Sequence, residues 1–171
     1  MAKRGSLRDF QEGLASRLKA AAVEAAPSAR LSFESGGGLW LMRLEGSGEV
    51  LPVPEIARVP LAKSWFLGVA NIRGVIYGVS DFSAFLGKEP TVRGLGNRLL
   101  LVGQPHALNA ALLVTRLAGL RNVSEFEAVE NSGPGAEWAE ASYRDADQRV
   151  WRELDSAKLL AHRDFLDIAL H

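Results

Sequence analysis

The chain has 171 residues, and its 20 Lys and Arg residues balance 20 Asp and Glu residues, so the formal net charge is zero. Apolar residues make up 47% of the sequence, which is enough for the core of one domain or of two small subdomains. The absence of cysteine excludes disulfides, thiol nucleophiles and Cys-bound metals, and it fits a reducing compartment. Nucleic-acid-binding proteins usually carry a basic excess, which this chain lacks.

The sequence also argues against membrane insertion. No apolar run approaches the ~20 residues that span a bilayer. Charged residues such as Asp9, Glu12 and Arg17 interrupt the N-terminal stretch, so it does not read as a secretory signal. We therefore expect a cytoplasmic protein.

Residues 1–30 are predicted to form an amphipathic helix and a linker. Ser6 and Asp9 have the spacing of a capping box at the start of the helix, and Pro27 ends it. Apolar residues at four-residue spacing form one face: Phe10, Leu14 and Leu18. Such a face can pack on its own domain, on a partner or on a membrane. The first is favoured, and the mixed charges of the polar face disfavour the last.

From about residue 31 onward, short apolar runs between Gly and Pro turn signals predict a mainly β protein. Pro52, Pro54 and Pro60 indicate a stretch that lies at a sheet edge or leaves the strand ladder. The predicted strands are 39–44, 49–53, 65–70, 75–79, 98–102, 111–114, 138–143 and 149–154.

Three further segments complete the prediction. Residues 82–86 form a short helical turn, and the polar segment 127–137 is expected to be a mobile surface loop. A C-terminal helix begins at Asp155 or Ser156. Its apolar face consists of Leu159, Leu166 and Leu170.

Motifs for catalysis or cofactor binding are missing. The three histidines, His106, His162 and His171, lack the spacing of a metal site, and residues 94–99 lack the third glycine of a dinucleotide-binding loop. Asp145 and Asp147 lack the glycine and the distal glutamate of a calcium loop, so turn chemistry explains them better. We expect no metal, no cofactor and no enzyme activity.

The segment 65–82 is the most informative. Gly68 interrupts an apolar strand, which indicates a β-bulge or a close backbone approach. Asn71 and Gly74 suit a tight turn with positive φ. Arg73 in that turn is presented either to solvent, as an ordinary surface arginine, or to a partner.

The sequence WFLGVANIRG, followed four residues later by V-S-D-F, resembles the G-[IV]-x-N-L-R-G-x-x-x-P-[IV]-x-D-L signature of CheW-like domains. Three weaker matches follow the family order, at 48–51, 111–114 and 154–160, so the resemblance covers about residues 38–161. The form of the first motif, together with Phe-Leu-Gly at 85–87, is most similar to the CheW-type adaptors of pilus chemosensory systems. The chain departs from the pattern at Gly78, Ala111 and Thr115, where the family has Pro, Gly and Asp.

The resemblance implies a mainly β fold of two intertwined five-stranded SH3-like β-barrels in residues 31–171, with an N-terminal and a C-terminal helix. It implies a non-enzymatic adaptor that couples the cytoplasmic tip of a chemoreceptor to the regulatory domain of a CheA-type histidine kinase. The expected output is type IV pilus (twitching) motility, with the protein at membrane chemoreceptor arrays.

The resemblance also assigns a partner-binding set: Glu49, Gly68, Asn71, Arg73 and Gly74. Asn71 and Arg73 would lie at the receptor-contacting groove, and Glu49 would face Arg73 as an ion pair. Gly68 would lie near the kinase-contacting edge. Asp81 is interpreted as a helix cap rather than a contact.

Two alternatives belong to other classes. One is a small β-barrel that binds nucleic acid or an oligosaccharide. The other is an enzyme that uses Asp81, Glu49 and a histidine, which would require a carboxylate with a strongly raised pKa in a closed pocket.

Overall fold

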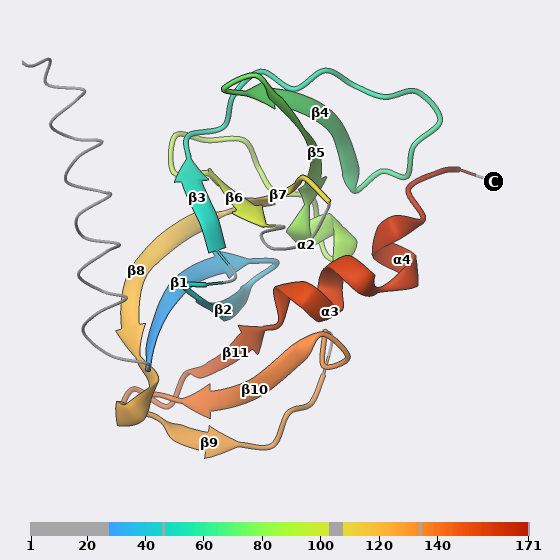
Figure 1. Ribbon diagram of the computed structural model, residues 1–171. Helices are drawn as coiled ribbons and strands as arrows, with labels where there is room; N and C mark the ends of the chain where they lie inside the picture. Colours follow the sequence, from blue (N-terminus) through green and yellow to red (C-terminus); the bar gives the residue numbers. More distant parts are fainter. Residues whose placement is uncertain (1–27, 46, 103–107, 134, 171) are drawn as a thin grey trace, which may run out of the picture.

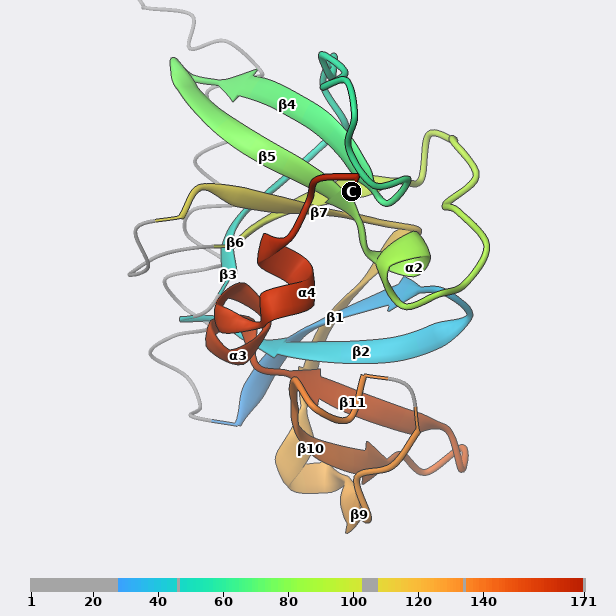
Figure 2. The same cartoon turned by 90° about the vertical axis from the view of Figure 1, so that its right-hand side faces the viewer.

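The computed structural model describes residues 28–45, 47–102, 108–133 and 135–170. The predicted N-terminal helix lies outside these residues. Within them the strands form two sheets, shown one above the other in Figure 2. The six-stranded sheet, in the order β8-β1-β2-β11-β10-β9, consists of β1 (Ala29–Ser35), β2 (Gly38–Arg43), β8 (Arg116–Asn122), β9 (Glu127–Val129), β10 (Ala139–Arg144) and β11 (Val150–Leu154). The five-stranded sheet, in the order β3-β6-β7-β5-β4, consists of β3 (Ser47–Leu51), β4 (Phe66–Ile72), β5 (Val75–Asp81), β6 (Arg98–Val102) and β7 (Ala110–Val114).

The two sheets are interleaved along the chain (Figure 1). Along the chain, β1 and β2 of the six-stranded sheet come first, then all strands of the five-stranded sheet, and then β8 to β11 of the six-stranded sheet. Neighbouring strands are antiparallel except for β2 with β11 and β5 with β7, which are parallel. The predicted mainly β architecture is confirmed. The six-stranded sheet has one strand more than the expected five, and three of its strands, β1, β8 and β9, were not predicted. β9 lies in the segment 127–137, which was wrongly predicted to be loop throughout.

The main core lies between the sheets. Phe33, Trp40 and Met42 of the six-stranded sheet are at most 1% exposed and pack with Leu112 and other residues of the five-stranded sheet. All five residues of β7 are buried, since alternate residues serve two cores on its two faces. This double burial explains why the sequence of β7 is uninterruptedly apolar.

The C-terminal region differs from its prediction. The expected single helix is broken at His162 (φ −73°, ψ 131°) into α3 (Ser156–Ala161) and α4 (Arg163–Leu166). Leu159 is buried, but Leu166 and Leu170 are 51% and 59% exposed, so the predicted common face is wrong. Phe165 is the buried residue of α4, and its ring stacks on Trp65 with the centroids 5.8 Å apart. The imidazole of His162 caps α4 by accepting from the backbone N–H of Asp164, which fixes the break.

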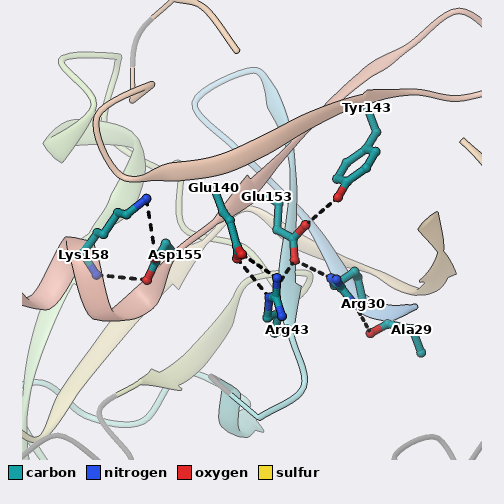
Figure 3. A network of polar contacts seen from close by, with 8 residues as sticks. All are labelled: Ala29, Arg30, Arg43, Glu140, Tyr143, Glu153, Asp155 and Lys158. Atoms are coloured by element: carbon teal, nitrogen blue, oxygen red, sulfur yellow. Dashed lines mark hydrogen bonds and ion pairs between the residues drawn. The ribbon is translucent and has the colours of Figure 1, made fainter. Parts of the chain in front are cut away.

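A partly buried ionic network joins four strands of the six-stranded sheet (Figure 3). Arg30 of β1 pairs with Glu153 of β11, and both are buried. The hydroxyl of Tyr143 donates to Glu153 at 3.0 Å, and Arg43 of β2 binds both Glu153 and Glu140. Burial raises the pKa of Tyr143, and the charge of Glu153 raises it further. Because removing one member of a buried pair leaves an uncompensated charge, this network fixes the register of β1, β2, β10 and β11.

Asp145 organises the turn between β10 and β11. Its buried carboxylate accepts the backbone N–H groups of Asp147 and Arg149, each at 2.9 Å, and the indole N–H of Trp151 at 2.8 Å. Burial alone would raise the pKa of Asp145, but the hydrogen bonds from Trp151 and Arg149 outweigh it and hold the pKa below its ordinary value. The interpretation of Asp145 as a turn residue is confirmed.

Gly68 allows the irregular segment after β3 to lie directly against β4. Val69 and Ala57 exchange two backbone hydrogen bonds of 2.8 Å, so Ala57 extends the sheet beyond β4. Gly68 has φ +130° and lies in a register shift, and a Cβ there would stand 2.0 Å from the carbonyl oxygen of Ala57. Both parts of the prediction, a bulge and a close backbone approach, are confirmed.

Replacing Asp145 should reveal its contribution to stability. We expect Asp145→Asn to lower the free energy of unfolding by about 1–3 kcal/mol at pH 7, because a buried donor loses its partner. Since the folded pKa is lowered, this contribution is present above the unfolded pKa of about 3.9 and disappears as pH falls through the folded value. This contribution can be measured by urea unfolding of both proteins at a series of pH values from 7 to 2.5. The control Asp147→Asn removes a carboxylate that is 74% exposed and should change little. If the difference in free energy of unfolding between the native protein and Asp145→Asn stays constant with pH, the stabilising role of the ionised Asp145 carboxylate is contradicted.

Replacing Gly68 tests the close approach. Gly68→Ala should lower the free energy of unfolding by more than about 3 kcal/mol, because backbone strain and overlap with Ala57 each cost on the order of 1–3 kcal/mol. The matched control is Gly87→Ala, at φ +72° with nothing within 4 Å of the new Cβ. It should lose only the strain energy of about 1–2 kcal/mol. Equal losses in the two variants, measured by chemical denaturation, would show that Gly68 is not sterically required.

Candidate functional site

The β4–β5 hairpin ends in a two-residue turn formed by Arg73 and Gly74. Ile72 pairs with Val75, and both turn residues have positive φ, +52° for Arg73 and +83° for Gly74. This is the pattern of a type I′ turn, whose twist matches that of the strands. Asn71 was expected to have positive φ but belongs to β4. It supports the turn with its side chain, whose Oδ1 accepts the N–H of Gly74 at 2.8 Å.

The turn presents Arg73 to Glu49 of β3. The guanidinium donates two parallel hydrogen bonds to the carboxylate, at 2.8 and 2.7 Å. The side chains remain 65% and 39% exposed, respectively. The predicted ion pair is therefore present.

The ion pair joins the two edges of the five-stranded sheet. β3 and β4 are its outermost strands, with β6, β7 and β5 between them. In a flat sheet four strand spacings would separate them by about 19 Å, more than an arginine and a glutamate can bridge. The sheet therefore curls, and at one end its edges approach closely enough for Glu49 and Arg73 to meet. This curvature agrees with the barrel shape that the resemblance implies.

The pair orients a cation more than it stabilises the fold. Exposed ion pairs contribute about 0–1 kcal/mol to stability. A carboxylate bound to both arms of a guanidinium does, however, fix the plane of that group. Arg73 thus offers its remaining donors and its flat face in one direction.

Gly68 lies at the opposite end of β4 from this turn. Five residues of extended chain separate it from Arg73, about 16 Å. Gly68 is itself buried beneath Ala57 and Arg58, so it can act only by positioning that segment. The structure therefore brings together Glu49, Asn71, Arg73 and Gly74 but not Gly68.

A cleft of about 300 Å³ opens beside the Gly68 end of β4. Its lining includes the apolar side chains of Phe66 and Leu67 and three basic residues: Arg58, Lys63 and Arg93. Lys63 pairs with Asp167 at 3.0 Å. Sequence reasoning missed this cleft. The three prolines indicated that the segment leaves the ladder, but no local signal shows that it folds back onto β4.

Asp81 and Glu49, the two carboxylates of the enzymatic alternative, both accept hydrogen bonds from the protein itself. Asp81 is 2% exposed and accepts the N–H groups of Ser83 and Ala84 at the start of α2 (Phe82–Phe85), as well as both donors of Thr91. Both oxygens of Glu49 accept from Arg73. Over the described ranges, no group of three or more His, Cys, Asp or Glu residues is arranged to hold a metal ion.

Gly78 stands where the family pattern has proline, and the local packing explains the difference. The N–H of Gly78 donates to the carbonyl oxygen of Asn109 at 3.0 Å, where the chain enters β7. A proline could not make this bond. A Cβ at Gly78 would also stand 3.2 Å from the ring of Phe66. The glycine therefore favours close packing between β4, β5 and β7.

Comparison with known proteins agrees with this architecture. Residues 30–164 match the CheW-like domain family. The chain is 27% identical to protein PilI of Pseudomonas aeruginosa over 143 residues, which cover 82% of this chain and 79% of PilI. It is 30% identical to chemotaxis protein CheW of Rhizobium meliloti over 98 residues, covering 56% and 61% of the two chains.

A solved structure shares the fold. The crystal structure of scaffolding protein TtCheW from Thermoanaerobacter tengcongensis superposes with a TM-score of 0.65 at 17% sequence identity, covering 75% of this chain and 89% of that one. Among the helices in the described part of the chain, none has the length and apolar character needed to cross a bilayer. The match over residues 30–164 shows that the chain belongs to the CheW-like domain family, and the two-sheet fold agrees with it.

Proposed function

We propose that this protein is a non-enzymatic adaptor that couples the cytoplasmic tip of a chemoreceptor to the regulatory domain of a CheA-type histidine kinase. Membership of the CheW-like family supports the adaptor function. The similarity to PilI extends over more of the chain than the similarity to the Rhizobium CheW. This favours a pilus chemosensory system with twitching motility as the output, and a cytoplasmic protein that associates with membrane chemoreceptor arrays.

The observation that carries the proposal is the doubly hydrogen-bonded, exposed pair of Arg73 and Glu49. An adaptor needs a rigid surface whose donors already point in one direction, because ordering them during binding would reduce affinity. The type I′ turn and Glu49 meet that need without contributing much to stability. Asn71, Arg73, Gly74 and Glu49 are thus the proposed receptor-contacting set.

The Gly68 end of β4 is the proposed kinase-contacting edge. Gly68 permits Ala57 and Arg58 to cover the strand, and both apolar and basic residues line the neighbouring cleft. Because about 16 Å of strand separates the two ends, receptor and kinase can be bound at once. Weak contacts at two sites gain strength when many copies assemble in an array.

The receptor contact predicts a specific loss of binding for Arg73→Ala. We expect affinity for a tip fragment of the cognate chemoreceptor to fall about tenfold or more, because charge-assisted hydrogen bonds are worth about 1.5–3 kcal/mol. Isothermal titration calorimetry measures it. The matched control is Arg116→Ala, since Arg116 forms a similar two-bond pair with Glu34 and is similarly exposed (63%). Equal affinities for the two variants would contradict the assignment.

The kinase contact predicts the complementary pattern for Arg58→Glu. Reversing this exposed charge at the cleft should weaken binding to the kinase regulatory domain while leaving receptor-fragment affinity unchanged. Arg73→Glu should do the opposite. Surface plasmon resonance with each partner in turn measures both. If both variants lose the same partner, the separation of the two contacts along β4 is wrong; if the native protein binds neither partner, the adaptor proposal itself fails.

A further inference from the structure

Leu61 adopts a backbone conformation that its side chain disfavours. It follows Pro60 in a turn between β3 and β4, and its φ is +56°. Proline followed by a residue at positive φ is the pattern of a type II turn, in which the second of these positions normally takes Gly or Asn. A leucine there is strained, because its Cβ crowds the backbone. Its side chain is 80% exposed, so it gains little packing within the described fold in return.

The backbone of this turn is held by residues 168–170. The carbonyl oxygen of Leu61 accepts the N–H of Leu170 at 2.9 Å, and the N–H of Lys63 donates to the carbonyl oxygen of Ile168 at 2.8 Å. Both bonds use main-chain atoms alone, so asparagine at position 61 would form them equally well. The fold therefore requires the turn but not the leucine. Side chains that hold the backbone in a strained conformation are found most often at functional sites.

The turn at Leu61 borders the cleft of about 300 Å³ beside β4. Val59 and Ala62, on either side of the turn, line this cleft together with Arg93 from the loop between α2 and β6. Val92, the neighbour of Arg93, is 87% exposed. Two separate loops thus display exposed apolar side chains next to one opening, and a single partner segment can cover both.

The charges around this cleft have one sign. Arg58 and Arg93 are exposed, and no carboxylate in the described ranges pairs with either of them. Lys63 is paired with Asp167, which is not among the residues that line the cleft. No acidic residue is among the lining residues. Such a surface attracts a negatively charged partner before contact and offers it donors at contact, whereas it repels a basic one.

We propose that the Leu61 turn and this cleft together bind an acidic segment that carries a large apolar side chain. The apolar side chain packs against Leu61 and Val92, and carboxylates of the same segment bind Arg58 and Arg93. That the segment belongs to the kinase regulatory domain rests on the proposed function. Leu61 thus lowers the stability of the free protein and raises the affinity of the complex.

Replacing Leu61 separates this contact from a structural role. Leu61→Asn relieves the strain and removes the apolar side chain. We therefore expect the urea midpoint of the full chain to stay the same or rise, while affinity for the kinase regulatory domain falls about tenfold or more. Surface plasmon resonance measures the affinity. The matched control is Val150→Asn, which removes an exposed apolar side chain next to a turn of the six-stranded sheet and should leave this affinity unchanged.

Salt dependence tests the acidic character of the partner segment. Raising the NaCl concentration from about 50 to about 300 mM should weaken native binding, because the added ions screen the charges. Arg93→Gln should bind more weakly at low salt and respond less to added salt, since it lacks one of the screened charges. The control Arg144→Gln removes a partly exposed arginine of the six-stranded sheet, and its salt response should equal that of the native protein.

Three results would overturn this proposal while the adaptor function stands, provided that the native protein binds the kinase domain. Leu61→Asn may not retain native affinity or lose only as much as Val150→Asn. A marked fall of the urea midpoint in Leu61→Asn would make Leu61 a structural residue. Equal salt responses of the native protein and Arg93→Gln would exclude an acidic segment at the cleft.

Two further results would assign the surface to another occupant. Loss of receptor-fragment affinity in Leu61→Asn, with kinase affinity intact, would assign it to the receptor. A native dimer in analytical ultracentrifugation that Leu61→Asn dissociates would assign it to a second copy of the chain. Either result overturns the proposal.

Discussion

The curvature of the five-stranded sheet is the constraint on which the candidate site depends. Without it, the two edge strands β3 and β4 would lie too far apart for Glu49 to reach Arg73. Two features permit the curl: the register shift at Gly68, which bends β4, and the all-buried strand β7, which packs residues on both of its faces. The packing of the core therefore brings the two sheet edges together, and the weak surface ion pair forms as a result. Its contribution is to hold one guanidinium in a defined direction.

A single strand carries both proposed contacts. β4 begins with the bulge that accepts the segment around Ala57, and it ends at the turn that presents Arg73. The antiparallel neighbour β5 and the parallel pairing of β5 with β7 hold this strand rigid between the two ends. An adaptor of this form would need no moving part, because its two surfaces are displayed at fixed separation. Asp81, the last residue of β5, ties the hairpin to α2 by capping that helix and to the following loop by accepting the N–H of Thr91.

Local chemistry made much of this fold predictable. All eight predicted strands are present in the described residues, because turn glycines and apolar runs mark them, and Gly68 and Asp145 behave as their surroundings suggested. Three strands were missed: β1, β8 and β9. β8 and β9 have mostly polar or exposed residues, and β1 and β8 pair with each other across about 90 positions of sequence, which local patterns do not show. The break at His162 was missed because a helical pattern hides a single extended residue. The resemblance supplied the pairing of Glu49 with Arg73, which are 24 positions apart, and local patterns could not have found it.

The most direct test of the central claim is an NMR titration of the isotopically labelled full-length protein with a chemoreceptor tip fragment. The account predicts that the largest amide shift changes fall at Glu49 and at Asn71–Gly74, and that the Gly68 end of β4 changes little until the kinase domain is added. Shift changes confined to the six-stranded sheet, with none at the β4–β5 turn, would contradict it.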